Sequence, residues 1–350
     1  MLDFFARNRV ATLCAVTVLA FLLIGMAAPG YLSLSTASVI MSNSLVLLSV
    51  SLGTMLVIPT RNIDVSSGSV LGLSAVVLGI MLNNGYGLGS AIAVCLLAGA
   101  VAGLINGVLV TILNVPSIIA TLGTLGLFRG FMLILTGGNW IEELPQPLKA
   151  LANNGDIGIS ILTVVVLMSL VAVWAFSRQT RFGRYFYAVG DNREAARHLG
   201  IPVKLVQIAA FVAAGVLAAI AGIIFAAQIG FIPNQAGNGL ELKSIAANVL
   251  GGVSLLGGSG TVPGIFVGVI FLTSIDSALV FLKIPAFWND FIAGAVLLLV
   301  LLLDGRVRIA VEKAIRAKRY AVHDPAPRTA PGTNPASEKN TRTRAQETGE

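Results

Sequence analysis

A short charged segment, GDNREAARHLGIP at residues 190–202, interrupts a chain that is otherwise strongly apolar. Asp191 can cap the start of a helix, and Glu194 three residues later completes a variant of the capping box. Gly200 can supply the left-handed residue at the helix end, and Pro202 prevents continuation. The segment therefore predicts a helix of about eight residues, which is too short to be stable alone in water and needs a docking surface.

The composition of this predicted helix favours a protein partner. Ala195 and Leu199 lie four residues apart and form a small apolar face, whereas Arg193 and Arg197 line another face. A surface helix resting on the membrane is the alternative interpretation, but such helices insert a larger apolar face into lipid. The small face suits a groove in a protein.

A second polar segment, TRNIDVSSGS at residues 60–69, joins two apolar runs. Ionisable groups beside membrane spans are costly and often mark functional sites. The segment could be an unwound, water-lined stretch near a transport pathway or gate. The alternative, which the position of the segment between two apolar runs favours, is a tight cytoplasmic turn, in which Asp64 or Ser66 caps the next helix and Arg61 contacts lipid headgroups. The candidate pathway residues in this segment are Arg61, Asn62, Asp64 and Ser66.

Other polar residues stand inside apolar runs. Arg129 could face a polar cavity, or its side chain could extend to the outer surface. Asp276 has no evident structural role and is a further pathway candidate. Asn289 and Asp290 lie near the start of the last apolar run, where a helix N-terminus favours an acidic group.

The chain lacks the motifs of the common catalytic sites. It has no Walker A loop and should not bind ATP phosphates itself, and its two histidines, His198 and His323, form no metal-ligand pattern. A serine nucleophile would have no histidine base within the membrane region. We expect no enzyme activity and no cofactor in this chain, so transport or conduction remains.

The elements that must position these residues are membrane helices. Of the 350 residues, 56% are hydrophobic and 11% are charged, whereas a soluble protein has roughly 25% charged residues. Apolar runs long enough to span a bilayer recur along the chain, and they predict an all-α polytopic membrane protein with about ten transmembrane helices. The alternative count is nine, because the eighth run is short and flanked by glycine. The expected spans are 10–28, 38–58, 67–83, 89–112, 115–136, 158–177, 203–228, 243–257, 261–282 and 286–303.

Basic residues indicate the orientation of the chain. Of the 23 Lys and Arg residues, two are at the N-terminus, six lie in 178–204 and ten follow Asp304. Because basic residues mark the cytoplasmic side, both termini and the 178–204 loop should be cytoplasmic. The net charge of +7 mostly reflects this bias and does not indicate a nucleic-acid partner. We expect a membrane domain over 1–310, followed over 311–350 by a basic cytoplasmic helix end and a disordered tail.

A possible inverted repeat links two distant segments. VLVTILNVPSII at 108–119 and SALVFLKIPAFW at 277–288 share an apolar helix end, a polar residue, a β-branched residue and proline. The predicted topology places the two turns on opposite sides of the membrane, as in transporters built from inverted halves. A chance match is the alternative, because proline often follows a helix end.

Four segments together resemble the ribose/arabinose-type family of bacterial ABC importer permeases. They are NIDVSSGSVLGL, ATLGTLGLFRG, AVGDNREAARHLGI and ELKSIAANVLGGVSLLGGSGTVPG, and the resemblance extends to about residue 310. It implies an inner-membrane subunit that pairs with a second permease, two ATP-hydrolysing subunits and a periplasmic binding protein. It also implies that membrane lipid surrounds this subunit.

The resemblance also gives the charged helix a partner. In such importers a cytoplasmic helix with a Glu-Ala-Ala-like motif docks into a cleft of the ATPase. The matching positions here are Glu194, Ala195, Ala196 and Gly200, and the spacing from Glu194 to Gly200 differs from that of the longer motif in other importer families. The residues expected to couple this chain to the ATPase are Asp191, Arg193, Glu194, Ala195, Ala196, Arg197 and Gly200.

Within the family, three further segments are most similar to permeases for autoinducer 2, a small, sugar-like, polyhydroxylated signal. The segments are TGGNWIEELP, AQIGFIPNQAGNGLELKSIAA and FLKIPAFWNDFIAGAVLLLVLLLDGR. This similarity implies import of autoinducer 2 by alternating access. The alternatives are a permease for ribose, xylose or another monosaccharide, or a proton-coupled secondary transporter that uses Asp64, Asp276 or Asp290.

Overall fold

The computed structural model describes residues 9–153 and 160–285, together with residues 288, 291, 292, 294, 295 and 298. The chain divides into two units, 1–301 and 302–350, and every described residue belongs to the first. The predicted helix end and tail over 311–350 therefore lie outside the described residues, as does most of the predicted span 286–303. Every regular element in the described part is a helix, which confirms the all-α class.

The described helices follow the apolar runs closely. Six of them are long and apolar enough to cross a membrane, and Val10–Met26 and Ser67–Asn83 are shorter apolar helices. Large apolar side chains remain exposed on the long helices, as expected for surfaces that face lipid. The elements are α2 (Arg9–Ala27), η1 (Pro29–Tyr31), α3 (Leu34–Val57), η2 (Ile58–Thr60), α4 (Ser67–Asn83), α5 (Leu88–Thr111), α6 (Ser117–Thr136), α7 (Gln146–Ala150), α8 (Ile161–Gln179), α9 (Arg181–Asp191), α10 (Arg193–His198), α11 (Val203–Ile229), α12 (Leu240–Leu250) and α13 (Val262–Phe281).

One predicted span differs from the structure. The run 243–257 was expected to cross the membrane, but α12 ends at Leu250 and has 11 residues. Such a helix is about 16 Å long, roughly half the thickness of the hydrocarbon core. Glycines with positive φ, including Gly252 and Gly257, bend the chain immediately after it. Within the described residues α12 is therefore a half-helix.

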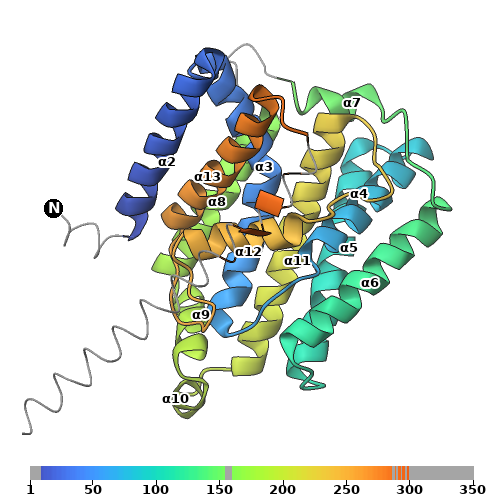
Figure 1. Ribbon diagram of the computed structural model, residues 1–350. Coiled ribbons are helices and arrows are strands. Elements are labelled where there is room, and N and C mark those ends of the chain that lie inside the picture. Colours follow the sequence, from blue (N-terminus) through green and yellow to red (C-terminus); the bar gives the residue numbers. More distant parts are fainter. Residues whose placement is uncertain are drawn as a thin grey trace, which may run out of the picture. The chain divides into compact units, whose positions relative to one another are not determined.

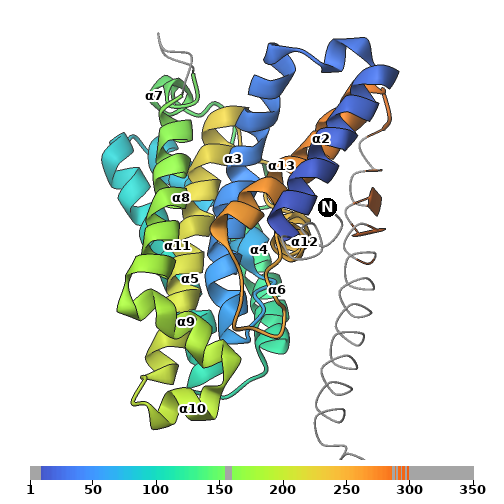
Figure 2. The same ribbon diagram turned by 90° about the vertical axis from the view of Figure 1, so that its left-hand side faces the viewer.

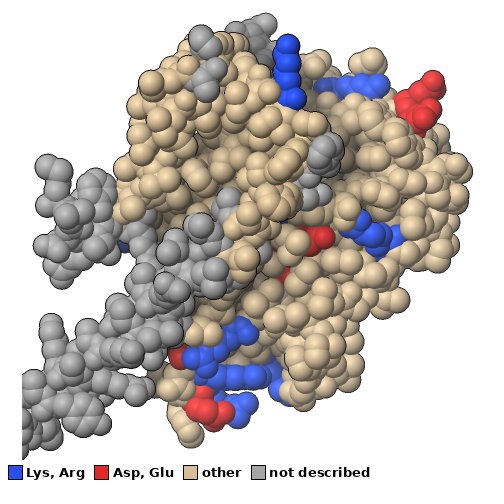
Figure 3. All heavy atoms as spheres, in the orientation of Figure 1, with Lys and Arg blue, Asp and Glu red and all other residues tan. Residues whose placement is uncertain are grey.

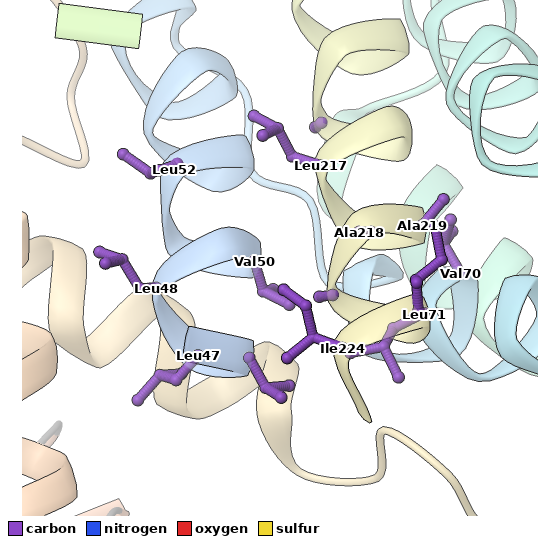
Figure 4. Packing of buried hydrophobic residues seen from close by; sticks show 14 of the residues in the cluster. Leu47, Leu48, Val50, Leu52, Val70, Leu71, Leu217, Ala218, Ala219 and Ile224 are labelled. Carbon is purple, nitrogen blue, oxygen red and sulfur yellow. The ribbon is translucent and has the colours of Figure 1, made fainter. Parts of the chain in front are cut away.

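Helix α11 lies at the centre of the helices, between α3 on one side and α4 and α5 on the other (Figure 1). Leucine, valine and alanine side chains fill these contacts, as the close view of α3, α4 and α11 shows (Figure 4). Helices α2 and α13 pack together, and α13 also contacts α3. Because many of the buried residues at these contacts are alanine or glycine, the helices can approach closely.

The crossing of α5 and α11 depends on glycine. A Cβ atom on Gly99 would collide with the carbonyl oxygen of Gly215, and a Cβ on Gly215 would collide with that of Gly99. One turn further along α5, Gly103 lies equally close to the Phe211 carbonyl. Small residues at four-residue spacing allow two membrane helices to bring their backbones together.

The turns after α5 and α13 have the same local geometry. Asn114 and Lys283 both adopt a left-handed conformation, with φ of 55° and 56°. Each is followed two residues later by proline, Pro116 and Pro285. These are the two segments whose sequences are alike.

Helices α7 and α10 lie at opposite ends of the described helices in both views (Figures 1 and 2). Charged side chains gather mostly toward these two ends of the visible face, and a few acidic and basic side chains also lie between them (Figure 3). This distribution is typical of a protein whose middle lies in a bilayer.

Candidate coupling surface and transport pathway

The 178–204 segment forms two consecutive helices, α9 and α10, at one end of the structure (Figure 2). Thr180 caps α9, since its hydroxyl accepts a hydrogen bond from the backbone N–H of Gly183 at 2.9 Å. Phe186 of α9 packs edge-on against Phe176 of α8, with ring centroids 5.4 Å apart. Helix α9, which the sequence did not predict, thereby fixes the base from which α10 projects.

The start of α10 corrects the predicted cap. Asp191 is the last residue of α9, and Asn192 caps α10 by accepting a hydrogen bond from the Ala195 N–H at 3.0 Å. The prediction that Asp191 is the N-cap is therefore wrong, and α10 has six residues instead of about eight. Gly200 has φ of 76°, which confirms the predicted left-handed residue at the helix end.

Most of α10 is available to a partner. Ala196 is buried against the rest of the chain, whereas Leu199 is 80% exposed. Glu194 and Arg197 approach each other at 3.7 Å, and both side chains are largely exposed. The other coupling candidates, Asp191, Arg193, Ala195 and Gly200, are exposed as well. An exposed leucine beside exposed charges is a suitable protein-docking surface.

Arg61 connects the base of α10 with two other segments. Its Nε donates to the Leu256 carbonyl at 2.9 Å, and its Nη2 donates to the Asp191 carbonyl at 3.2 Å. Beside it, the Gly258 N–H donates to the Pro59 carbonyl at 3.0 Å. The guanidinium therefore joins the end of η2, the end of α9 and the loop between α12 and α13, which the sequence did not predict.

The polar residues that follow Arg61 are buried. Asn62, Asp64 and Ser66 are 6%, 4% and 0% exposed. Asp64 Oδ1 accepts hydrogen bonds from the N–H and the hydroxyl of Ser66, at 2.8 and 2.7 Å. Asn106 of α5 donates to the Ser66 hydroxyl at 2.7 Å and accepts from the Thr124 hydroxyl of α6 at 2.7 Å. One hydrogen-bond network thus connects this segment with two membrane helices.

The backbone between η2 and α4 is irregular and forms hydrogen bonds with side chains of α6. The Ile63 N–H donates to the Ser117 hydroxyl at 3.1 Å, and the Val65 N–H donates to the Thr121 hydroxyl at 3.2 Å. Irregular backbone at membrane depth is tolerated only where other groups satisfy its hydrogen bonds. This conformation agrees with the unwound interpretation, while its place beside a pathway stays a prediction.

Arg129 lies within α6 and is partly buried. Its Nε and Nη2 atoms are buried and have no hydrogen-bond partner among the described residues. Two enclosed guanidinium nitrogens fit a side chain that faces the interior better than one that extends to the surface. A pathway role for Arg129 remains a prediction.

Asp276 has a partner that the sequence did not reveal. Lys243 Nζ lies 3.1 and 3.0 Å from its two carboxylate oxygens. The side chains are 14% exposed for Lys243 and 32% for Asp276. The pair joins α12 to α13 and gives Asp276 a structural explanation. Asn289 and Asp290 lie outside the described residues.

Several buried polar residues were missed from the sequence. Asn248 of α12 donates to the Thr54 hydroxyl of α3 at 2.7 Å, and Gln207 of α11 donates to the Thr60 carbonyl at 3.3 Å. Asn106, described above, belongs to the same class. Each of these residues is a single amide within an apolar run of the sequence. This pattern could have identified them, because a buried amide needs a hydrogen-bond partner.

The comparisons with known proteins agree with this arrangement. Residues 35–301 match the family described as the branched-chain amino acid transport system/permease component. The autoinducer 2 import system permease proteins LsrC of Yersinia pestis (strain Pestoides F) and Yersinia pseudotuberculosis (serotype O:3, strain YPIII) are 52% identical over 321 residues, which cover 92% of each chain. The protein of that name from Salmonella typhi is 52% identical over 322 residues, again 92% of each chain.

No solved structure matches the chain. The resemblance to importer permeases that the sequence predicted is confirmed by the family match and by these relatives. The match covers α3 to α13 and therefore includes the coupling surface, the buried segment after Arg61 and the ion pair between α12 and α13. The chain belongs to the branched-chain amino acid transport system/permease component family.

Proposed function

We propose that this chain is the transmembrane permease subunit of an ATP-driven importer that carries autoinducer 2 across the bacterial inner membrane. The observation that carries the proposal is the 52% identity to autoinducer 2 import permeases over 92% of both chains. Identity of this extent covers the helices that position the candidate pathway as well as the exposed helix α10.

The proposed assembly contains two copies of an ATPase subunit, a second homologous permease and a periplasmic substrate-binding protein, surrounded by membrane lipid. ATP is bound and hydrolysed by the ATPase partners, and this chain contributes to the transport pathway through the membrane. Helix α10 supports the assignment, because a six-residue helix with an exposed leucine gains stability when a partner covers it.

The proposed topology has ten membrane crossings and cytoplasmic termini, with α9 and α10 in the cytoplasm. The half-helix α12 makes one of these crossings together with the loop that follows it, which Arg61 holds at Leu256. The six basic residues of 178–204 support this orientation. In the inverted repeat, α3, α4 and α5 correspond to α11, α12 and α13. Each series has a long helix, an irregular segment, a shorter helix and another long helix, and the two series end in left-handed turns before proline.

The proposed mechanism is alternating access. Closure of the ATPase pair moves α10, and Arg61 transmits this movement from the end of α9 to the loop before α13 and to η2. The buried segment of Asn62, Asp64 and Ser66 then acts at the cytoplasmic gate, while Arg129 faces the pathway. A two-state rearrangement of packed segments can convert a small displacement at one site into opening at another.

The experiment that tests the coupling uses substitutions on α10. Glu194→Lys reverses a charge on the proposed docking face, and Leu199→Asp places a charge on its exposed apolar residue. We expect both variants to insert in the membrane but to lose co-purification with the ATPase and ATP-driven uptake in proteoliposomes. Tyr86→Asp is the matched control, because Tyr86 is 57% exposed in the loop after α4. Normal ATPase binding by both α10 variants would refute the coupling surface.

Two alternatives predict different uptake. A monosaccharide permease would carry labelled ribose or xylose in preference to autoinducer 2, so competition between these solutes distinguishes the substrates. A proton-coupled transporter would work on a proton gradient without an ATPase. Two of its candidate carriers have local partners, because Asp64 accepts a hydrogen bond from the Ser66 hydroxyl and Asp276 pairs with Lys243. The third candidate, Asp290, lies outside the described residues.

A further inference from the structure

An open cavity of about 1210 Å³ is lined in part by Lys149 of α7. Helix α7 lies at the end of the helices opposite the coupling helix α10 (Figure 1). The cavity is bounded by α3, by the segment before α7, and by the chain from the end of α11 to the start of α12. Pockets for small ligands usually have volumes of roughly 300–1,000 Å³, so this one can admit a small solute together with water. Neither the coupling surface nor the buried segment after Arg61 contributes to it.

Two loops hold one wall of the cavity in place. Ile141 and Ile232 exchange backbone hydrogen bonds of 3.0 and 2.8 Å. Asn234 Nδ2 donates to the Gly138 carbonyl at 3.1 Å, and the Trp140 and Phe231 rings are stacked 5.5 Å apart at an interplanar angle of 10°. The wall is therefore a fixed frame. Trp140 remains 53% exposed, which leaves much of its apolar surface available to a ligand.

Amide side chains line the cavity without partners of their own. Asn43, Gln235 and Asn238 are exposed to the open cavity and form no side-chain hydrogen bond to any described residue. Gln228 is held by Ser42, to whose carbonyl it donates at 2.9 Å. An amide offers two donors and one acceptor, and a hydroxyl group both donates and accepts. Several free amides around one space match a ligand with several hydroxyl groups.

The charges in the cavity disfavour an anion. Glu142 and Glu143 contribute two carboxylates to the lining, and Lys149 contributes one ammonium group. The carboxylates can accept hydrogen bonds from hydroxyl groups, but they repel a phosphate or carboxylate on a ligand. Glu143 also has a left-handed φ of 57°, a conformation that costs energy for a residue other than glycine and is enriched at ligand sites.

We propose that this cavity is the outward-facing site that receives a small, neutral, polyhydroxylated solute before it enters the pathway. The inference rests on the proposed import function and assigns the residues that recognise its substrate. Trp140 supplies an apolar surface, Asn43, Gln235 and Asn238 bond to hydroxyl groups, and the carboxylates exclude anionic forms. A loop of a binding protein would be a different occupant of the same cavity, and the experiment below separates the two.

The test measures binding of autoinducer 2, ribose and ribose 5-phosphate to the assembled importer in nanodiscs without the binding protein. Docking of the substrate-free binding protein to the same nanodiscs is then measured separately. We expect Asn43→Ala, Asn238→Ala and Trp140→Ala each to raise the Kd of the neutral solute at least tenfold. Asn84→Ala is the control, because Asn84 is an exposed amide that lies outside the cavity lining. Ribose 5-phosphate should not compete. The two asparagines form no side-chain hydrogen bonds, so their substitution should leave folding intact.

The outcomes separate this inference from the proposed function. If the parent imports autoinducer 2 but all three variants bind it as tightly as the parent does, the cavity assignment is wrong while the import function stands. If the variants weaken docking of the substrate-free binding protein and leave solute affinity unchanged, the cavity is a protein-docking surface and the inference is also overturned. If the parent assembly imports no autoinducer 2, the proposed function itself fails.

Discussion

The ion pair between α12 and α13 permits a quantitative prediction. Asp276→Asn removes the carboxylate that pairs with a Lys243 ammonium group that is only 14% exposed, and Lys243→Met removes one of the partners of a carboxylate that is 32% exposed. Breaking a fully buried pair costs about 3–5 kcal/mol, whereas exposed pairs contribute about 0.2–1 kcal/mol. The exposure of Asp276 reduces the loss, so we expect each single variant to be less stable by about 1–3 kcal/mol.

The assay is a double-mutant cycle. The free energy of unfolding is measured by SDS titration in mixed micelles for the parent, both single variants and the Lys243→Met/Asp276→Asn double variant. The double variant should lose less than the sum of the single losses by at least about 1 kcal/mol, because neither charge is left without its partner. Glu194→Gln is the stability control, since its pair with Arg197 is largely exposed and should contribute nothing measurable.

Two results would refute the reasoning. Additive losses in the cycle would mean that the 3.0 Å contact does not stabilise the fold. A double variant that is stable but cannot carry out ATP-driven uptake would return Asp276 to the transport pathway. Recovery of both stability and uptake would establish a structural role and remove one candidate carrier from the proton-coupled alternative.

Two further predictions concern helix contacts. Gly215→Val should prevent α11 from packing against α5, so the variant should no longer elute as a single monodisperse peak in size-exclusion chromatography. Gly126→Ala is the control: a Cβ atom there meets no atom within 4 Å, so this variant should elute as the parent does. Asn192→Ala should weaken α10 by about 0.5–2 kcal/mol and reduce co-purification with the ATPase, because it removes the cap. Asp191→Ala keeps the backbone carbonyl that Arg61 uses and should have a smaller effect; an equal or larger effect would contradict the assigned cap.

The hydrogen bond from Arg61 to the end of α9, just before α10, has a mechanical consequence. Since Arg61 bonds to the Asp191 carbonyl immediately before α10, displacement of α10 must either move the loop at Leu256 or break a charge-assisted hydrogen bond. The same chain segment continues into the buried network around Asp64 and Asn106. This continuity is the physical basis for proposing that docking at α10 affects the gate.

The positions of most helices could be predicted from the sequence because each is a local property. An apolar run of about 20 residues must become a helix in lipid, so the predicted runs 67–83 and 203–228 coincide with α4 and α11 within one residue. Gly200 was predicted as the end of α10 for a similar reason, since few residues other than glycine adopt its φ of 76°.

The start of α10 could not be settled in the same way, because Asp191 and Asn192 are both good caps. The choice depends on packing: Gly190 lies against the Pro59 carbonyl, and α9 continues through Asp191, whose carbonyl Arg61 then holds. The sequence by itself therefore determined the class, most of the long helices and the location of the charged segment. The tertiary structure decided which distant residues are partners, such as Lys243 with Asp276 or Trp140 with Phe231, because such pairs arise only when helices and loops far apart in the chain pack together.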